Sequence, residues 1–114
     1  MNKTERPWGW YINVKEEKEM FKIKHICVYP GKRLSLQSHH HRSEHWVIVK
    51  GQAKVQVGKD QLLLHTNQNV YIPKETLHRI ENVGNENVEF VETQIGHYLE
   101  EDDIIRYEDD FGRT

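Results

Sequence analysis

Three consecutive histidines, His39, His40 and His41, stand out in a sequence that contains 8 histidines among 114 residues. On an extended strand, residues two positions apart face the same way, so Gln37, His39 and His41 share one face. After a short turn, a hairpin can bring Glu44 back to converge with Gln37 and His39. Imidazole, carboxylate and carboxamide groups together suit a divalent cation such as zinc, manganese, cobalt, nickel or iron.

His78 is a further candidate ligand on a distant stretch of the chain, shortly after Pro73. A site with four or fewer protein ligands leaves a coordination position for water or a sugar hydroxyl. The residues therefore favour a metal centre that is assembled from two separate segments.

Short β-strands are the elements that must position these residues. Glycine and proline interrupt the chain at short intervals, and apolar and polar residues alternate between them with a period near two. The predicted strands are Phe21–Tyr29, Glu44–Lys50, Ala53–Val57, Gln61–Leu64, Asn69–Ile72, Thr76–Glu81 and Val88–Ile95. Gly58-Lys59-Asp60 predicts a hairpin turn, and no segment before Leu99 has a convincing helical period. The sequence therefore predicts an all-β sandwich or barrel.

Two charged segments depart from this pattern. Val14–Met20 is predicted to be a solvated turn between two strands. Tyr98–Thr114 is acidic, and we expect there either a short helix that starts near Glu100–Asp103 or an irregular, solvated tail. Acidic residues at that position suit a helix N-terminus.

Composition limits the class of protein. With 36% hydrophobic and 30% charged residues, the sequence predicts a water-soluble, folded chain, and its length predicts a single domain over residues 1–114. A formal net charge of -2 argues against nucleic acid or an anionic membrane as a partner. The single Cys27 argues against a disulfide framework and fits a cytoplasmic location. No apolar run approaches the roughly 20 residues of a membrane span, and Met1–Trp10 lacks the apolar centre of a signal peptide.

The spacing of the candidate ligands resembles the sequence motifs of the cupin family. The first motif fits with Gly31, five residues, Gln37, one residue, His39, four residues, Glu44, six residues and Gly51. The resemblance implies a small β-barrel, or jelly roll, of the cupin type with the metal site inside it.

The second cupin motif fits with Asn67, five residues, Pro73, one residue, Glu75, two residues, His78, three residues and Asn82. Asn67 and Glu75 stand where the motif usually has glycine. Asparagine tolerates the left-handed backbone that glycine often supplies, so Asn67 is a mild departure.

Gln37 is the larger departure from the motif. It replaces the first histidine, and a carboxamide oxygen is a weaker ligand than imidazole. His41, on the same strand face, or His45 could take its place, but the spacing favours Gln37.

Longer segments resemble the type II phosphomannose isomerase (mannose-6-phosphate isomerase) family. They are RPWGWY (Arg6–Tyr11), FKIKHICVYPGKRLSLQSHHHRSEHW (Phe21–Trp46), VYIPKETLHRIEN (Val70–Asn82) and YLEEDDIIRYEDDFGR (Tyr98–Arg113). In that family this domain often forms the C-terminal part of a bifunctional enzyme with a mannose-1-phosphate guanylyltransferase domain. The chain has no room for that domain and lacks a Gly-rich phosphate loop, so we expect no guanylyltransferase function in it.

The resemblance implies interconversion of mannose 6-phosphate and fructose 6-phosphate, in which a proton moves between C1 and C2 through an enediol(ate). A divalent cation held by Gln37, His39, Glu44 and His78 would stabilise the enediol(ate) oxygens as a Lewis acid. A base must move the carbon-bound proton, and a cationic side chain must hold the phosphate.

Arg42 is the first candidate for contact with the sugar phosphate. It lies beside the proposed ligands, and the matching arginine is implicated in substrate handling in the family. Arg33, Lys74 and Arg79 are secondary candidates because they flank proposed ligands on their segments.

The base stays open between His41, His45, Glu92 and a metal-bound hydroxide. Glu92 shares a face of the last predicted strand with Phe90 and Gln94. If that face lines the barrel, burial would raise the pKa of its carboxyl group and suit it to proton transfer.

Other functions compete with the isomerase. One is a non-catalytic cupin that binds a sugar phosphate or nucleotide sugar, or works beside a separate guanylyltransferase. Another is a metal-dependent dioxygenase or epimerase, since cupins host many reactions. By analogy with cupins that pair through N-terminal strands, we also expect a homodimer, with Pro7–Val14 as an exchanged or abutting strand.

Overall fold

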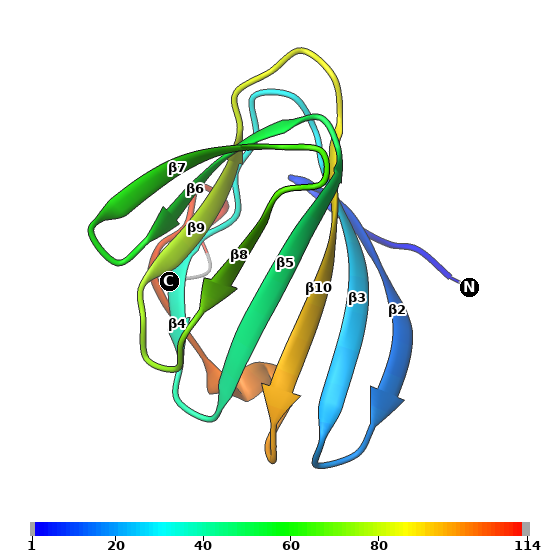
Figure 1. Ribbon diagram of the computed structural model, residues 1–114, viewed down its shortest axis with the longest axis vertical. Coiled ribbons are helices and arrows are strands. Elements are labelled where there is room, and N and C mark those ends of the chain that lie inside the picture. Colours follow the sequence, from blue (N-terminus) through cyan, green and yellow to red (C-terminus); the bar gives the residue numbers. More distant parts are fainter. Residues whose placement is uncertain (1, 113–114) are drawn as a thin grey trace.

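The computed structural model describes residues 2–112. Over this range the chain forms strands β1 to β11 and one short 3-10 helix, η1 (Figure 1). The elements are β1 Thr4–Arg6, β2 Gly9–Glu17, β3 Phe21–Val28, β4 Leu36–His39, β5 Arg42–Lys50, β6 Gln52–Val57, β7 Asp60–His65, β8 Asn69–Ile72, β9 His78–Asn82, β10 Val88–Gly96, η1 Glu101–Asp103 and β11 Ile104–Glu108.

The strands form two antiparallel sheets. One sheet has the order β1-β2-β3-β10-β5-β8, and the other has the order β11-β4-β9-β6-β7. The chain passes from the first sheet to the second between β3 and β4, and returns between β4 and β5 (Figure 1). Residues close in sequence therefore line both walls of the interior, and the predicted all-β jelly roll is confirmed.

The observed strands follow the predicted ones with two local differences. β9 starts at His78 instead of Thr76, because the chain turns at Glu75, which has a positive φ of 63°. β2 continues to Glu17, so most of the turn predicted at Val14–Met20 is strand. The end of β2 is exposed, so its charged side chains are solvated, and the backbone can still form a strand there.

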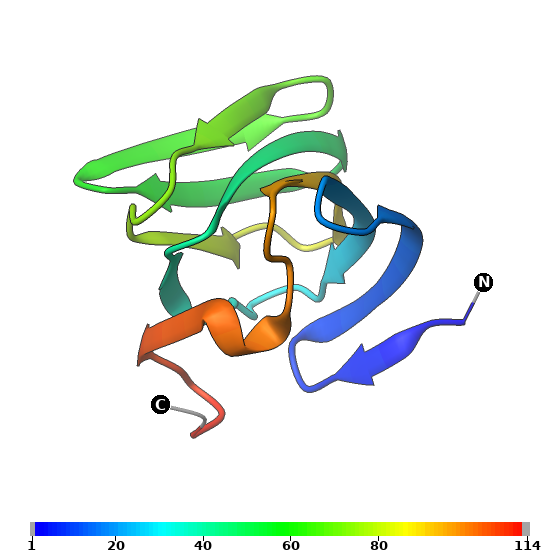
Figure 2. The same ribbon diagram turned by 90° about the horizontal axis from the view of Figure 1, so that it is seen from below.

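The acidic C-terminal segment is more regular than the sequence indicates. Its helical part is the single turn η1, and β11 then pairs with β4. The buried carboxylate of Asp103 accepts hydrogen bonds from the backbone N–H groups of His40 (3.1 Å) and His41 (3.0 Å). The segment thus holds the turn between β4 and β5, and it lies on the same side of the barrel as the N-terminal strands (Figure 2).

Along the inner face of the first sheet, buried apolar residues give way to buried charged residues only two positions further along the strands. Ile48, Phe90 and Ile26 are neighbours on β5, β10 and β3, and all are buried. Burial of apolar side chains of this size stabilises the fold by roughly 1.5–3 kcal/mol each. Two residues further, the same face carries Glu92 on β10 and Lys24 on β3, which are neighbours and also buried.

Four positions of the cupin motifs have a left-handed backbone, the first of them being Gly31 with a φ of 76°. Gly51 has a φ of 85°, and a Cβ atom there would lie 2.6 Å from the carbonyl oxygen of Asn87. Asn67 (φ 76°) and Glu75 (φ 63°) adopt the same region, which costs most residues roughly 1–2 kcal/mol. The backbone N–H of Glu75 donates a 2.7 Å hydrogen bond to the carbonyl of His39, so the strained turn joins the second motif to the first.

The N-terminal strands pair within the chain. β2 lies between β1 and β3, and β1 is the last strand of its sheet among the described residues. A second copy that adds to this sheet would meet β1 before it meets β2. The expected homodimer through Pro7–Val14 stays a prediction.

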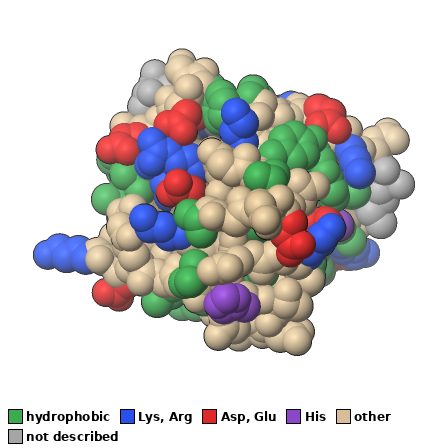
Figure 3. Space-filling model, turned by 90° about the horizontal axis from the view of Figure 1, so that it is seen from above, with side chains coloured by type: hydrophobic (Ala, Val, Ile, Leu, Met, Phe, Trp, Pro, Cys, Tyr) green, Lys and Arg blue, Asp and Glu red, His purple; other side chains and the backbone are tan. Residues whose placement is uncertain are grey.

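No helix among residues 2–112 is long and apolar enough to cross a membrane. The face seen in Figure 3 carries Lys and Arg side chains close to Asp and Glu side chains. This mixture agrees with the small formal net charge of -2.

Candidate metal centre

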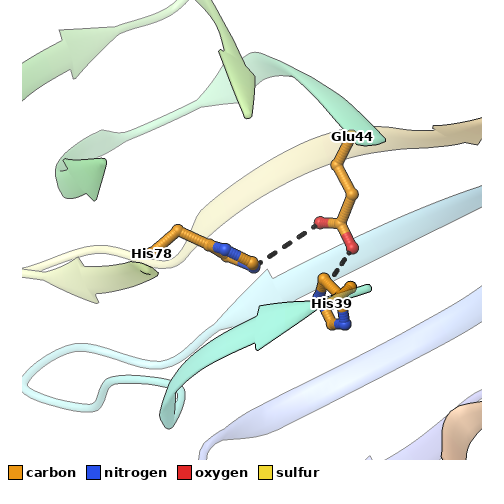
Figure 4. A group of neighbouring side chains, drawn as sticks. All are labelled: His39, Glu44 and His78. Carbon is orange, nitrogen blue, oxygen red and sulfur yellow. Dashed lines mark ion pairs between the residues drawn. The ribbon is translucent and has the colours of Figure 1, made fainter. Parts of the chain in front are cut away.

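Three potential metal ligands meet between the two sheets. His39 ends β4 and Glu44 lies near the start of β5, in the opposite sheet. His78 begins β9, beside β4. One ligand atom from each residue lies within 4.8 Å of the other two, and all three side chains are buried (Figure 4). We call these three residues the ligand cluster.

The distances in the ligand cluster fit a divalent cation. Nε2 of His39 lies 3.0 Å from Oε2 of Glu44, and Nε2 of His78 lies 4.0 Å from Oε1 of the same carboxylate. Zinc, for example, binds nitrogen and carboxylate oxygen at about 2.0–2.2 Å, so two atoms on one ion lie roughly 3–4 Å apart. Two imidazoles and a carboxylate are donors that such cations accept.

The imidazole of His78 is oriented by its own segment. Its Nδ1 lies 2.9 Å from the carbonyl oxygen of Thr76, and a proton on Nδ1 leaves Nε2 as the ring atom with a free lone pair. Burial lowers the pKa of His78, although the charge of Glu44 partly opposes this shift. His78 is therefore neutral near pH 7, as a metal ligand must be.

Both oxygens of Glu44 accept hydrogen bonds from neighbours on β5. Trp46 Nε1 donates to Oε1 at 2.9 Å, and Arg42 Nε donates to Oε2 at 2.8 Å. Burial disfavours the charged form, but the hydrogen bond to His39 and the charge of Arg42 outweigh burial and hold the pKa of Glu44 well below its usual range. The carboxylate is ionised and fixed in orientation.

Arg42 is buried beside the ligand cluster instead of being solvated. Its Nη2 lies 3.4 Å from Nε2 of His39. Its Nη1 is buried, has no hydrogen-bond partner among the described residues, and belongs to a side chain that lines the adjoining cavity. A buried donor without a partner is rare, so this atom is suited to a ligand that enters the cavity.

A cavity of about 230 Å³ opens beside the ligand cluster. Glu44 and His78 line it, and so do the exposed side chains of Arg6 and Glu101, so the cavity reaches from the cluster to the surface. Its volume is close to the lower limit of sites for small organic ligands, roughly 300 Å³.

Other residues singled out in the sequence also line this cavity. They are Gln37, Glu92, Arg42 and Arg79. Gln37 is the strand neighbour of His78, and its amide nitrogen lies 3.1 Å from Oγ of Ser35. Arg79 donates hydrogen bonds to the Leu34 carbonyl and to Glu108, so its guanidinium fixes the wall of the cavity.

The structure does not bring His41, Arg33 or Lys74 into the cavity. His41 is exposed, and its ring lies against those of His97 and Tyr98. It follows the last residue of β4 in a turn, so the strand alternation that grouped it with Gln37 and His39 no longer applies. Arg33 forms a bidentate pair with Asp110, and Lys74 is exposed before the turn at Glu75.

His45, the other alternative for the fourth ligand and for the base, also lies outside the cavity. It is exposed on the outer face of β5, where its Nε2 lies 3.0 Å from Oδ1 of Asn69. Gln37 therefore remains the candidate that shares a cavity with the ligand cluster.

Glu92 is buried on β10, where Gln94 Nε2 donates a 2.8 Å hydrogen bond to its carboxyl group. Burial, followed by the negative charge of Glu44, raises the pKa of Glu92 to about 8. A carboxyl group with a pKa near neutrality can both accept and donate a proton.

Four charged residues that line the cavity were not predicted from the sequence: Arg6, Lys24, Glu101 and Arg106. The alternation contains a signal for Lys24, because it shares a strand face with the buried Ile26. Nothing local places the other three, since their positions depend on how the two ends of the chain meet at the barrel.

This fold and the two-motif site define the class of protein as a cupin, and solved structures agree. The cupin domain of Cnp3 from Schizosaccharomyces pombe matches with a TM-score of 0.79 and 17% identity, over 84% of this chain and 69% of that chain. A predicted oxalate decarboxylase from Thermotoga maritima matches with a TM-score of 0.72 and 18% identity, over 76% of this chain and 79% of that chain. At these identities the likeness concerns the fold alone.

The chain belongs to the family described as mannose-6-phosphate isomerase C-terminal, whose model matches residues 1–109. The xanthan biosynthesis protein XanB of Xanthomonas campestris is 50% identical over 98% of this chain and 24% of its own length. The alginate biosynthesis protein AlgA of Pseudomonas aeruginosa is 51% identical over 96% of this chain and 22% of its own length.

A relative with a different name matches an equally large share of the chain. The mannose-1-phosphate guanylyltransferase of Escherichia coli is 45% identical over 96% of this chain and 23% of its own length. The chain thus spans about a quarter of the length of these curated relatives.

Proposed function

We propose that this chain is a metal-dependent isomerase that interconverts mannose 6-phosphate and fructose 6-phosphate. One observation carries the proposal: the ligand cluster opens onto a cavity that also contains a buried carboxyl group with a pKa near neutrality. The family description supports the choice of substrate.

His39, Glu44 and His78 would hold the divalent cation, with Gln37 as the fourth ligand. When bound, the ion supplies Lewis-acid stabilisation to the oxygens on C1 and C2. Trp46 and Arg42 keep the carboxylate of Glu44 in one orientation, and Thr76 does the same for the His78 ring.

Glu92 is the base in this proposal. Its carboxylate takes the proton from C2 of the open-chain aldose and returns it to C1, while the O2 hydroxyl proton passes to O1. The sum of these transfers is the ketose, with no atom gained or lost. His41 is not retained as a base, because its exposed ring lies outside the cavity.

Arg42 contributes to substrate binding through its unpartnered Nη1 atom. A guanidinium donor in a buried site forms strong hydrogen bonds to the oxygens of a sugar phosphate. Arg33 and Lys74 have no role in the proposed site because neither lines the cavity.

Activity of the isolated chain tests the proposal. The purified protein is stripped with a chelator, each divalent cation is restored separately, and formation of fructose 6-phosphate from mannose 6-phosphate is followed. The proposal expects turnover with at least one of these cations and none in the chelated sample. Absence of turnover with every cation contradicts it.

A non-catalytic sugar-phosphate-binding cupin is the alternative function. It is favoured by the name of the Escherichia coli relative, a guanylyltransferase, and by the small share of that relative which this chain covers. Saturable binding of mannose 6-phosphate without turnover under any metal condition would support this alternative.

A further inference from the structure

Two cations meet at one aromatic ring at the outer part of the cavity. Nζ of Lys24 lies 4.5 Å from the centre of the Tyr11 ring, and the guanidinium carbon of Arg6 lies 5.5 Å from it. All three residues line the cavity. The two positive charges therefore lie at most about 10 Å apart beside one cavity, where both attract the same anion, and the ring offsets part of their mutual repulsion.

These cations lie apart from the ligand cluster but in the same cavity. Lys24 on β3 and Glu44 on β5 are separated by β10, and adjacent strands are about 4.8 Å apart, so the two backbones are about 10 Å apart. An open-chain hexose phosphate can bridge such a distance between its carbonyl end and its phosphate.

Arg42 and Arg79 also line the cavity but are held in place by the protein. Arg42 donates to Glu44 and keeps only its Nη1 atom unpartnered among the described residues, and Arg79 donates to Glu108 and to a backbone carbonyl. By contrast, Arg6 is exposed, and among the described residues its guanidinium donates a hydrogen bond only to the carbonyl of its neighbour Glu5. Arg6 can therefore turn toward a ligand at little cost.

Lys24 has a partner that resembles the group it would bind. Its Nζ lies 2.9 Å from Oε1 of Glu101, a carboxylate that is more than half exposed and also lines the cavity. Glu101 belongs to η1, on the same side of the barrel as β1 (Figure 2). A dianionic phosphate at this place would compete with that carboxylate for the ammonium group.

We propose that Arg6 and Lys24 form a phosphate site at the mouth of the cavity. In the absence of phosphate, the Glu101 carboxylate forms an ion pair with the Lys24 ammonium group, and a bound phosphate displaces it. Tyr11 keeps the two cations together. The identity of the ligand as a sugar phosphate rests on the proposed isomerase function, but the site itself is defined by its affinity for phosphate.

Binding of inorganic phosphate to the chelator-treated chain, measured by titration calorimetry at constant ionic strength, tests this site without any need for turnover. Arg6→Gln and Lys24→Gln should each weaken phosphate binding by about tenfold or more, because each removes a charge-assisted hydrogen bond. Glu101→Gln should strengthen binding several-fold, since it removes the competing negative charge. Wild-type protein that binds no phosphate, or unchanged affinity in both cation variants, would overturn the proposal.

Lys22→Gln is the matched control. Lys22 lies on the same strand face as Lys24 and also contacts the C-terminal segment, through the Leu99 carbonyl at 3.2 Å, but it does not line the cavity. This variant should bind phosphate like the wild type. A loss equal to that of Lys24→Gln would mean that loosening of the C-terminal segment, rather than loss of a phosphate ligand, causes the effect.

Folding and activity are separated from this test by two more measurements. Lys24→Arg retains the positive charge and should keep most of the affinity for phosphate. Affinity that is kept in Lys24→Arg but lost in Lys24→Gln shows that the charge binds phosphate. If the chain is an isomerase, Arg6→Gln and Lys24→Gln should raise KM for mannose 6-phosphate much more than they lower kcat. Unchanged KM would contradict the site while leaving the isomerase intact, and phosphate binding without isomerisation would do the reverse.

Discussion

Trp46 Nε1 donates a 2.9 Å hydrogen bond to Oε1 of Glu44, two residues earlier on the same strand. The other carboxylate oxygen accepts a hydrogen bond from Arg42, so the carboxylate group cannot rotate freely. Hydrogen bonds of this kind orient a metal-binding carboxylate and raise the affinity of the site. The indole is therefore part of the candidate metal centre although it offers no ligand atom.

Trp46→Phe should lower the affinity for a divalent cation by about 10- to 100-fold, because it removes this hydrogen bond and retains an aromatic ring. Competition with a chromophoric chelator measures the change. Trp8→Phe is the control, since Trp8 lines the same cavity and its buried Nε1 has no hydrogen-bond partner among the described residues. Equal effects of the two substitutions would show that the hydrogen bond to Glu44 does not matter.

Gln37 and His41 give opposite expectations for the fourth ligand. Gln37 lines the cavity beside His78, whereas His41 is exposed and lies against His97 and Tyr98. Gln37→Ala should weaken metal binding by about tenfold, and His41→Ala should leave it unchanged. The same chelator competition decides between them, and the reverse order of effects would assign the fourth position to His41.

Glu92 should make the metal-free protein less stable as pH rises. Below about pH 4.5 the carboxyl group is protonated in both the folded and the unfolded chain. Between 4.5 and its folded pKa of about 8, only the unfolded chain is ionised, so stability falls through this range and the full cost remains above it. Glu92→Gln removes this dependence.

The measurement is the midpoint of denaturant unfolding of chelator-treated protein at a series of pH values. Glu92→Gln should be more stable than the wild type at pH 8–9, and the difference should shrink toward pH 4.5. A difference that is constant with pH would show that the pKa of Glu92 is not raised by folding.

The sequence predicted the ligand cluster because regular spacing encodes it. His39, Glu44 and His78 match the two motifs, and the strands that carry them were found by alternation. His41 lies outside the cavity, because strand parity does not extend into the turn after His39. Lys24 was not singled out, since a lysine in an alternating strand is ordinarily solvated and only the neighbouring Glu101 and Glu92 make its burial tolerable.

The C-terminal segment illustrates a different limit of sequence reasoning. Its many acidic residues left open a short helix near Glu100–Asp103 or a solvated tail, and neither alternative predicted that Asp103 is buried and accepts hydrogen bonds from the turn that follows β4. That role depends on a contact between residues more than sixty positions apart. No local periodicity reports such a contact.

Glu75→Gly should stabilise the fold by up to about 1 kcal/mol. Glu75 has a φ of 63°, a conformation that costs a residue with a Cβ roughly 1–2 kcal/mol, and glycine relieves it at some cost in unfolded-chain entropy. Lys74→Gly is the control, because Lys74 does not have a positive φ and should only lose stability. Thermal or denaturant unfolding compares them, and a destabilised Glu75→Gly would show that the side chain compensates for its backbone strain.

Metal binding by the ligand cluster is the central claim, and equilibrium dialysis followed by elemental analysis tests it most directly. Chelator-stripped protein that is dialysed against zinc, manganese, cobalt, nickel or iron should take up about one ion per chain with at least one of them. His78→Ala, with an unchanged circular dichroism spectrum, should take up almost none. Wild-type protein that binds no ion, or a His78→Ala variant that binds as much as the wild type, would contradict the account.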